Sequence, residues 1–182
     1  LRTDGFLMAV FTVIGSTTLG ATAQNITMSS IPDTYDHLYL TASVREGGTA
    51  LSAPLEFRFN DDSSPYSNTY LDASTGTPTS SRAESSATGD VIGTTGAGGM
   101  LADTFSAITM WIPHYANTAN GKQVFIKSAC PNNSTTNSEW FLRLTAGLWD
   151  DTAAINKFRM QAAGGPELEV GTSVVLYGIT GA

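Results

Sequence analysis

Cysteine and charged residues are the scarcest features of this 182-residue chain. Its one cysteine, Cys130, excludes an internal disulfide framework and a zinc site built from several cysteines. No histidine lies near Cys130 in the sequence, so a buried structural thiol is predicted. Charged residues amount to 14%, against about a quarter in an ordinary soluble domain. Serine, threonine, asparagine and glycine must therefore cover much of the surface, which is uncommon in a cytosolic enzyme.

Basic residues are scarce as well, with nine Lys and Arg against 16 Asp and Glu and a net charge of −7. Because so few cations cannot neutralise many phosphates, no nucleic-acid partner is expected. No apolar run approaches the length of a transmembrane helix, so no membrane partner is expected. The length fits one domain, and the hydrophobic content of 41% is sufficient for a core.

Signals for long helices are lacking, because 18 glycines and seven prolines interrupt the chain. Apolar and polar residues alternate instead, which predicts β-strands. The clearest alternating segments span residues 37–45, 54–60, 106–113, 122–130, 139–149, 155–161 and 172–180. Eight or nine short strands separated by turns indicate an all-β fold, an antiparallel β-sandwich that is jelly-roll-like and covers residues 25–182.

The alternation also groups side chains by face. In segment 54–60 the inward residues are expected to be Leu55, Phe57 and Phe59. In segment 139–149 the residues that share one face are Trp140, Leu142, Leu144, Ala146 and Leu148. Tryptophan is more often buried than exposed, so Trp111, Trp140 and Trp149 are expected in the core, with stacking on a ligand as the alternative reading.

Residues 73–99 differ from the rest of the chain, because they are rich in Ser, Thr and Gly and nearly devoid of large apolar groups. Such a segment cannot form a core layer, so a long loop within the sandwich domain is predicted. A loop of this length either has a function, such as lying over a neighbouring subunit, or is a solvated excursion.

Residues 1–24 admit two interpretations. A cationic start, an apolar run and a small-residue A-T-A resemble a secretory signal peptide. Against this, Asp4 lies in the region that should be positive, and the β-branched Thr12, Val13 and Ile14 favour a strand. We predict an N-terminal arm or strand for docking or subunit exchange. The residues expected at this interface are Phe6, Leu7, Met8, Val10, Phe11 and Val13.

No motif in the chain amounts to an active site, so no enzyme activity and no catalytic residue are predicted. His37 and His114 are interpreted as polar surface histidines, since a triad needs a serine and an acid brought together in space. The glycine-rich stretch 93–99 lacks the lysine and the following helix of a phosphate-binding loop, and no cofactor is predicted.

Carboxylates and asparagines offer no clear site either. Asp61–Asp62 and Asp150–Asp151 are sequence neighbours that point in different directions, so neither pair forms an acid–base couple alone. The stretch 60–68 has oxygen ligands for calcium but not the spacing of a calcium loop, and no metal is predicted. Asn25 and Asn133 begin glycosylation sequons, which matter only on a eukaryotic secretory route.

Five motifs occur in an order that resembles a β-sandwich module of tailed bacteriophages, found in virion surface proteins such as head-decoration and tail-fibre chains. They are Ile31–Leu40, Leu55–Asp62 with Tyr66 and Tyr70 after it, Trp111–Thr118, Gly147–Ile155 and Gly171–Ile179. The ordered set covers about residues 25–180. In the last motif, Gly178 is expected to permit tight packing against a neighbouring backbone.

The resemblance implies a structural virion protein that forms oligomers, often trimers. The small size and the apolar N-terminal segment favour a capsid decoration (cement) protein, located on the capsid surface with the major capsid protein as its partner. The alternative is a tail-fibre module that binds a receptor or a carbohydrate. A hydrolase on the same scaffold is the third and weakest reading, because only an unrecognised set of carboxylates could support it. It is kept because fold alone never settles function.

Overall fold

A computed structural model of the chain describes residues 9–63, 65–74, 77–86, 89–130 and 140–181, with the backbone alone over 89–96. All regular structure in these ranges is β-structure, so the all-β prediction is confirmed. The strands are β1 (Val10–Thr18), β2 (Asn25–Met28), β3 (His37–Val44), β4 (Ser52–Phe59), β5 (Tyr66–Ser74), β6 (Thr77–Ser86), β7 (Gly89–Gly96), β8 (Ser106–Pro113), β9 (Lys122–Cys130), β10 (Phe141–Trp149), β11 (Phe158–Ala162) and β12 (Ser173–Thr180).

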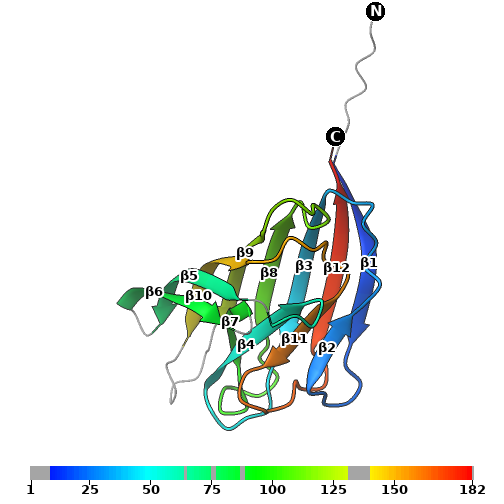
Figure 1. Cartoon of the computed structure of the whole chain (residues 1–182). Coiled ribbons are helices and arrows are strands. Elements are labelled where there is room, and N and C mark those ends of the chain that lie inside the picture. The colour runs from blue at the N-terminus through cyan, green and yellow to red at the C-terminus, as the bar shows by residue number, and fades with distance from the viewer. Residues whose placement is uncertain (1–8, 64, 75–76, 87–88, 131–139, 182) are drawn as a thin grey trace, which may run out of the picture.

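The strands form two antiparallel sheets that pack as a sandwich. The larger sheet has eight strands in the order β1-β12-β3-β8-β9-β10-β5-β6, and the smaller has four in the order β2-β11-β4-β7. Figure 1 shows the smaller sheet lying across one side of the larger one, with the β5–β6 hairpin projecting at the far end. The β-sandwich prediction is confirmed, whereas the jelly-roll connectivity remains a prediction.

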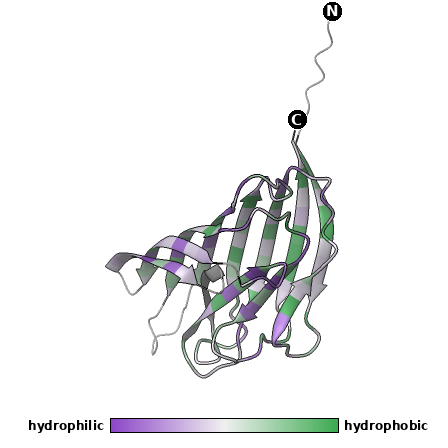
Figure 2. Cartoon of the chain, viewed as in Figure 1, coloured by the Kyte–Doolittle hydropathy of each residue, from purple (hydrophilic) through white to green (hydrophobic). Residues whose placement is uncertain are grey.

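The core follows from the alternation predicted in the sequence. In β3 every second residue is buried, beginning with Leu38 and Leu40, and β4 buries Leu55, Phe57 and Phe59 as expected. Figure 2 shows the resulting alternation of hydrophobic and hydrophilic residues along the strands. Burying such side chains contributes about 1.5–3 kcal/mol each, which is the main force holding the two sheets together.

Trp149 lies in an aromatic cluster at one end of the core. Its ring centroid is 5.5 Å from that of Phe59 and 6.3 Å from that of Tyr66, whose ring is nearly parallel to it. The indole N–H donates to Asp62 at 3.2 Å, so burial leaves no unsatisfied donor. The core prediction is therefore confirmed for Trp149, whereas Trp140 is 39% exposed and the prediction is wrong for it.

The prediction of a long loop over 73–99 is wrong for most of that segment, because β6 and β7 lie within it. β6 pairs with β5 from Ser74–Thr77 to Tyr66–Ser86, and the β7 backbone pairs with β4. Low hydrophobicity suggested a loop, but an edge strand needs no buried face when a neighbour supplies its hydrogen bonds. Threonine also favours strands, and the charged Arg82 and Glu84 protect the free edge of β6 from unwanted pairing.

The N-terminal strand is confirmed for the described part of its segment. β1 pairs with β12 of the same chain, from Val10–Thr180 to Thr18–Ser173, with an irregularity between Val13 and Gly15. It forms the edge of the larger sheet opposite to β6. The strand therefore adds to its own sheet, and whether it also docks on a partner stays a prediction.

Candidate functional site

The larger sheet has an outer face that the smaller sheet does not cover. On this face three leucines are exposed, which we call the leucine patch: Leu71 by 60%, Leu142 by 52% and Leu144 by 38%. Leu71 on β5 is the register partner of Leu144 on β10. Soluble monomers rarely leave adjacent large apolar side chains in contact with water, so the patch is a candidate contact surface.

The leucine patch faces outward because polar residues occupy the inner side of the same strands. Arg143, between Leu142 and Leu144, pairs with the Asp72 carboxylate at 2.7 Å, and both side chains are about nine-tenths buried. The Arg143 guanidinium also lies 4.2 Å from the centre of the Tyr70 ring. Successive residues of a strand point to opposite faces, so placing the ion pair inside places the leucines outside.

An aromatic row crosses the outer face from β1 to β9. Consecutive register partners on neighbouring strands are Val13, Tyr177, Tyr39, Trp111 and Phe125. A second ring from β1 joins this row, because the Phe11 ring makes edge contacts with Tyr39 at 5.9 Å and Tyr177 at 6.2 Å. The prediction that Trp111 lies in the core is thus wrong, because its ring lies on the outer face of the sheet and is only partly buried.

The predicted docking residues that the structure describes all lie on the edge strand β1, where Phe11 and Val13 point to this outer face and Val10 points to the opposite one. Val10, Phe11 and Val13 are 56%, 55% and 56% exposed. Phe6, Leu7 and Met8 lie outside the described residues. Val10, Phe11 and Val13 are thus accessible to a partner, and their docking role stays a prediction. The leucine patch at the other end of the sheet was not identified from the sequence.

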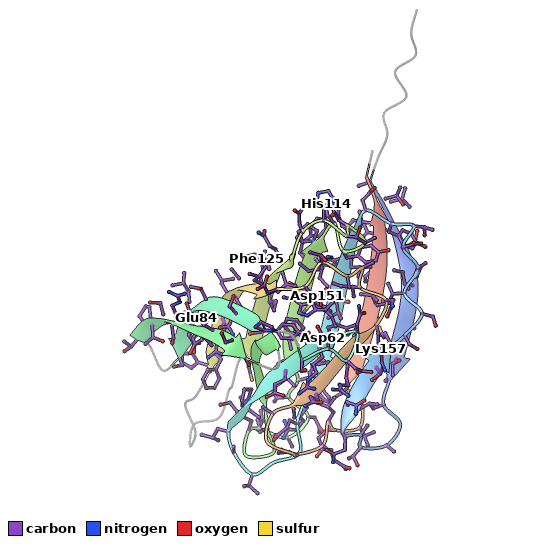
Figure 3. All side chains as sticks on the ribbon, viewed as in Figure 1. Asp62, Glu84, His114, Phe125, Asp151 and Lys157 are labelled. Carbon is purple, nitrogen blue, oxygen red and sulfur yellow. The ribbon has the colours of Figure 1, made fainter. Side chains whose placement is uncertain are left out.

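A groove opens on the outer face over strands β5, β6, β8, β9 and β10. It has a volume of about 540 Å³, and a second hollow of about 540 Å³ shares Pro113, Gln123 and Leu148 with it. The residues that line the first hollow include Trp111, Phe125, Gln123, Ser67, Thr69 and Arg82. Figure 3 labels Phe125 in the first hollow and His114 in the second.

The two histidines lie together near this groove. Their ring centroids are 4.7 Å apart, and the His114 backbone N–H donates to His37 Nδ1 at 3.1 Å. Burial, together with the nearby His114, lowers the pKa of His37 below its usual value. His37 also contacts the Trp111 ring at 4.8 Å, so its imidazole packs against the aromatic row.

The acidic loop after β4 forms a turn, as predicted. Asn60 and Asp61 both have φ of 55°, and Asn60 Oδ1 accepts the N–H groups of Asn156 and Lys157 at 2.9 and 3.1 Å. Asp61 pairs with Lys157, whose hydrogen bond lowers the pKa of this carboxyl, and with Arg159 at 3.4 Å. These side chains therefore join the turn to the chain before β11.

The described residues form no metal site and contain one buried thiol. Among the residues that the structure describes, no group of three or more His, Cys, Asp or Glu side chains is placed to hold a metal ion. Cys130 is buried as predicted, its sulfur lies 3.4 Å from Met100 Sδ, and burial raises the pKa of its thiol. Asn25 is described at the start of β2, whereas Asn133 lies outside the described ranges.

Comparisons place the chain beside no known protein: it matches no protein-family model, no curated protein and no solved structure. Within the described ranges, no helix has the length and apolar character to cross a membrane. The fold defines the chain as an all-β sandwich whose larger sheet has one face that the smaller sheet leaves uncovered.

Proposed function

We propose that the chain is a structural, non-enzymatic virion protein of a tailed bacteriophage, a capsid decoration protein that binds the head shell. The observation that carries the proposal is the uncovered face of the larger sheet, which has the leucine patch at one end and the exposed Phe11 and Val13 at the other, with Val10 exposed on the same edge strand. Two separate apolar areas suit a protein that must contact both its own copies and the shell beneath them.

The leucine patch is assigned to the contact with a neighbouring copy in a homotrimer. Lys127 is the one charged register partner of Leu144, and its ammonium lies 5.9 Å from the centre of the Phe125 ring. Contacts between identical subunits are more apolar and less charged than transient ones, which matches the composition of this patch. Each Å² buried contributes about 25 cal/mol, and symmetry multiplies this contribution over the particle.

The exposed residues of β1 are assigned to the major capsid protein. Val10, Phe11 and Val13 stand at the edge of the sheet, where the next chain can reach both their side chains and the free backbone of β1. Adding a strand to such an edge is a common mode of docking between proteins.

The copy number of the chain in purified particles tests the proposal. We expect hundreds of copies per particle, at a simple fraction of the major capsid protein, measured by quantitative mass spectrometry. A decoration protein must occupy equivalent lattice positions, which imposes this stoichiometry. Absence of the chain from particles would overturn the proposal.

The trimer contact has a separate test in the purified chain. Leu144→Glu places a carboxylate in the centre of the leucine patch and is expected to convert trimers to monomers in sedimentation velocity runs. Thr41→Glu is the matched control, because Thr41 lies on the same outer face, two register partners beyond Lys127. Trimers that persist in Leu144→Glu would show that the patch is not the contact.

A receptor-binding module of the phage tail is the second candidate, and the groove at Trp111 favours it. An aromatic side chain on the outer face beside polar groups is typical of ligand-binding sites. The copy number separates the two candidates, since a tail module would be present in only a handful of copies per particle.

A further inference from the structure

We propose that the groove on the outer face binds an uncharged oligosaccharide, with Trp111 and Phe125 as its floor and Gln123 as a polar contact. The site goes beyond the decoration function and holds for a head or a tail location alike. Its failure would leave the particle stoichiometry untouched, so the two proposals fail separately.

The floor consists of two aromatic rings on neighbouring strands. Trp111 on β8 and Phe125 on β9 are register partners and both line the groove. The His37 ring, 4.8 Å from the Trp111 ring, supports the indole from the side of β3. A sugar ring presents a face of C–H groups, and such a face packs on an aromatic ring with little loss of solvation for its hydroxyl groups.

The depth of the groove comes from small residues beside the rings. The next register partner of Phe125 is Ala146, and the partner of Ala146 is Thr69, followed by Arg82 on β6. Large side chains therefore stand on both sides of two small ones in one row across the sheet. This arrangement makes a trough rather than a flat surface, which distinguishes it from the leucine patch.

The walls of the groove supply neutral hydrogen-bonding groups. Gln123 has an amide that both donates and accepts, and Ser67 and Thr69 carry hydroxyl groups. In the second hollow, Asn117 and Asn120 add amides, although Asn117 Oδ1 already accepts the Ala119 N–H at 2.7 Å. Amides and hydroxyls beside aromatic rings match the alternating polar edges and apolar faces of a sugar.

The charges around the groove favour an uncharged ligand over an anionic one. Among the described residues, Arg82 is the one cation that lines the first hollow, and its guanidinium already pairs with Glu84 on the same strand. Asp150 lines the second hollow, and the chain has a net charge of −7. An anionic polymer such as nucleic acid would therefore meet a repulsive field.

The size of the groove fits more than one sugar unit. Each hollow has about 540 Å³, within the range of about 300–1,000 Å³ that small-molecule sites occupy. The two hollows adjoin, because Pro113, Gln123 and Leu148 line both of them. We therefore expect an oligosaccharide to bind at least ten times more tightly than its own monosaccharide.

The experiment begins with a printed array that carries neutral hexose and N-acetylhexosamine oligomers beside uronic acid oligomers. The strongest neutral oligomer is then titrated into the full chain by calorimetry. We expect Trp111→Ala and Gln123→Ala each to weaken its binding at least tenfold. Trp140→Ala is the matched control, since Trp140 is exposed but does not line the groove, and its affinity should equal that of the wild type.

Three results would overturn the proposal. One is the absence of binding by any neutral oligomer at millimolar concentration. Another is selective binding of the uronic acid oligomers. The third is an unchanged affinity in Gln123→Ala. This variant tests the proposal even if Trp111→Ala fails to fold, because Gln123 is exposed and its substitution does not disturb the core.

Discussion

Asp72→Ala is expected to lower the free energy of unfolding by about 3–5 kcal/mol, because it leaves the buried Arg143 guanidinium without its carboxylate partner. Proteins of this size have a total stability of about 5–15 kcal/mol, so this one substitution removes a large share of it. The measurement is the midpoint of urea unfolding, followed by circular dichroism and by tryptophan fluorescence.

Two variants test the cause of this loss. Glu84→Ala breaks the exposed pair with Arg82 and should leave the midpoint almost unchanged, because exposed ion pairs contribute little. Asp72→Val combined with Arg143→Leu replaces the buried pair by apolar groups and should regain most of the lost stability. If Asp72→Ala destabilises no more than Glu84→Ala, the pair does not determine the inner packing of β5 and β10.

The same ion pair contributes, with Trp149, to the choice of the residues of β10 that face water. Leu142 and Leu144 are exposed because Arg143 and Thr145 take the inner side of β10. Loss of the pair in Asp72→Ala removes one of the interactions that hold this orientation, so β10 should open more often near the leucine patch. Protection of the β10 amides from hydrogen exchange would therefore fall in this variant more than in Glu84→Ala.

Gly178→Ala is expected to cost about 2–3 kcal/mol, in the upper part of the range for overpacking a core. A Cβ at this position would lie 2.3 Å from Cγ of Tyr35, so the ring must move or the strand must shift. Thermal unfolding followed by circular dichroism would measure the loss. A glycine is therefore needed at position 178 because the Tyr35 ring packs against it, whereas the sequence predicted close approach to a neighbouring backbone.

A double-mutant cycle checks this reason. In a Tyr35→Ala background, Gly178→Ala should cost far less, because the clashing ring is absent and the two substitutions are coupled. Gly15→Ala on the neighbouring strand β1 is the control, since its Cβ would meet only Met28 Sδ at 3.8 Å, an ordinary contact. Equal losses for Gly178→Ala in both backgrounds would assign its effect to the backbone instead.

Part of the candidate site was predictable from the sequence. The β-branched residues 12–14 indicated the strand that exposes Val10, Phe11 and Val13. The groove was not predictable, because Trp111, Phe125, Ala146 and Thr69 become neighbours only when β8, β9, β10 and β5 pair. Nothing local in the sequence marks such residues as a set, and the tryptophans in particular were expected in the core.

The sequence by itself determined the all-β class and most of the strands, because alternation of apolar and polar residues is a local property with a period of two. It also determined that Cys130 would be buried. Alternation defines two faces of a strand but does not say which one meets the core, and in β10 the burial of Trp149, together with the Arg143–Asp72 pair, decided that. Likewise β6 is a strand only because β5 supplies its hydrogen bonds, and those bonds exist only in the tertiary structure.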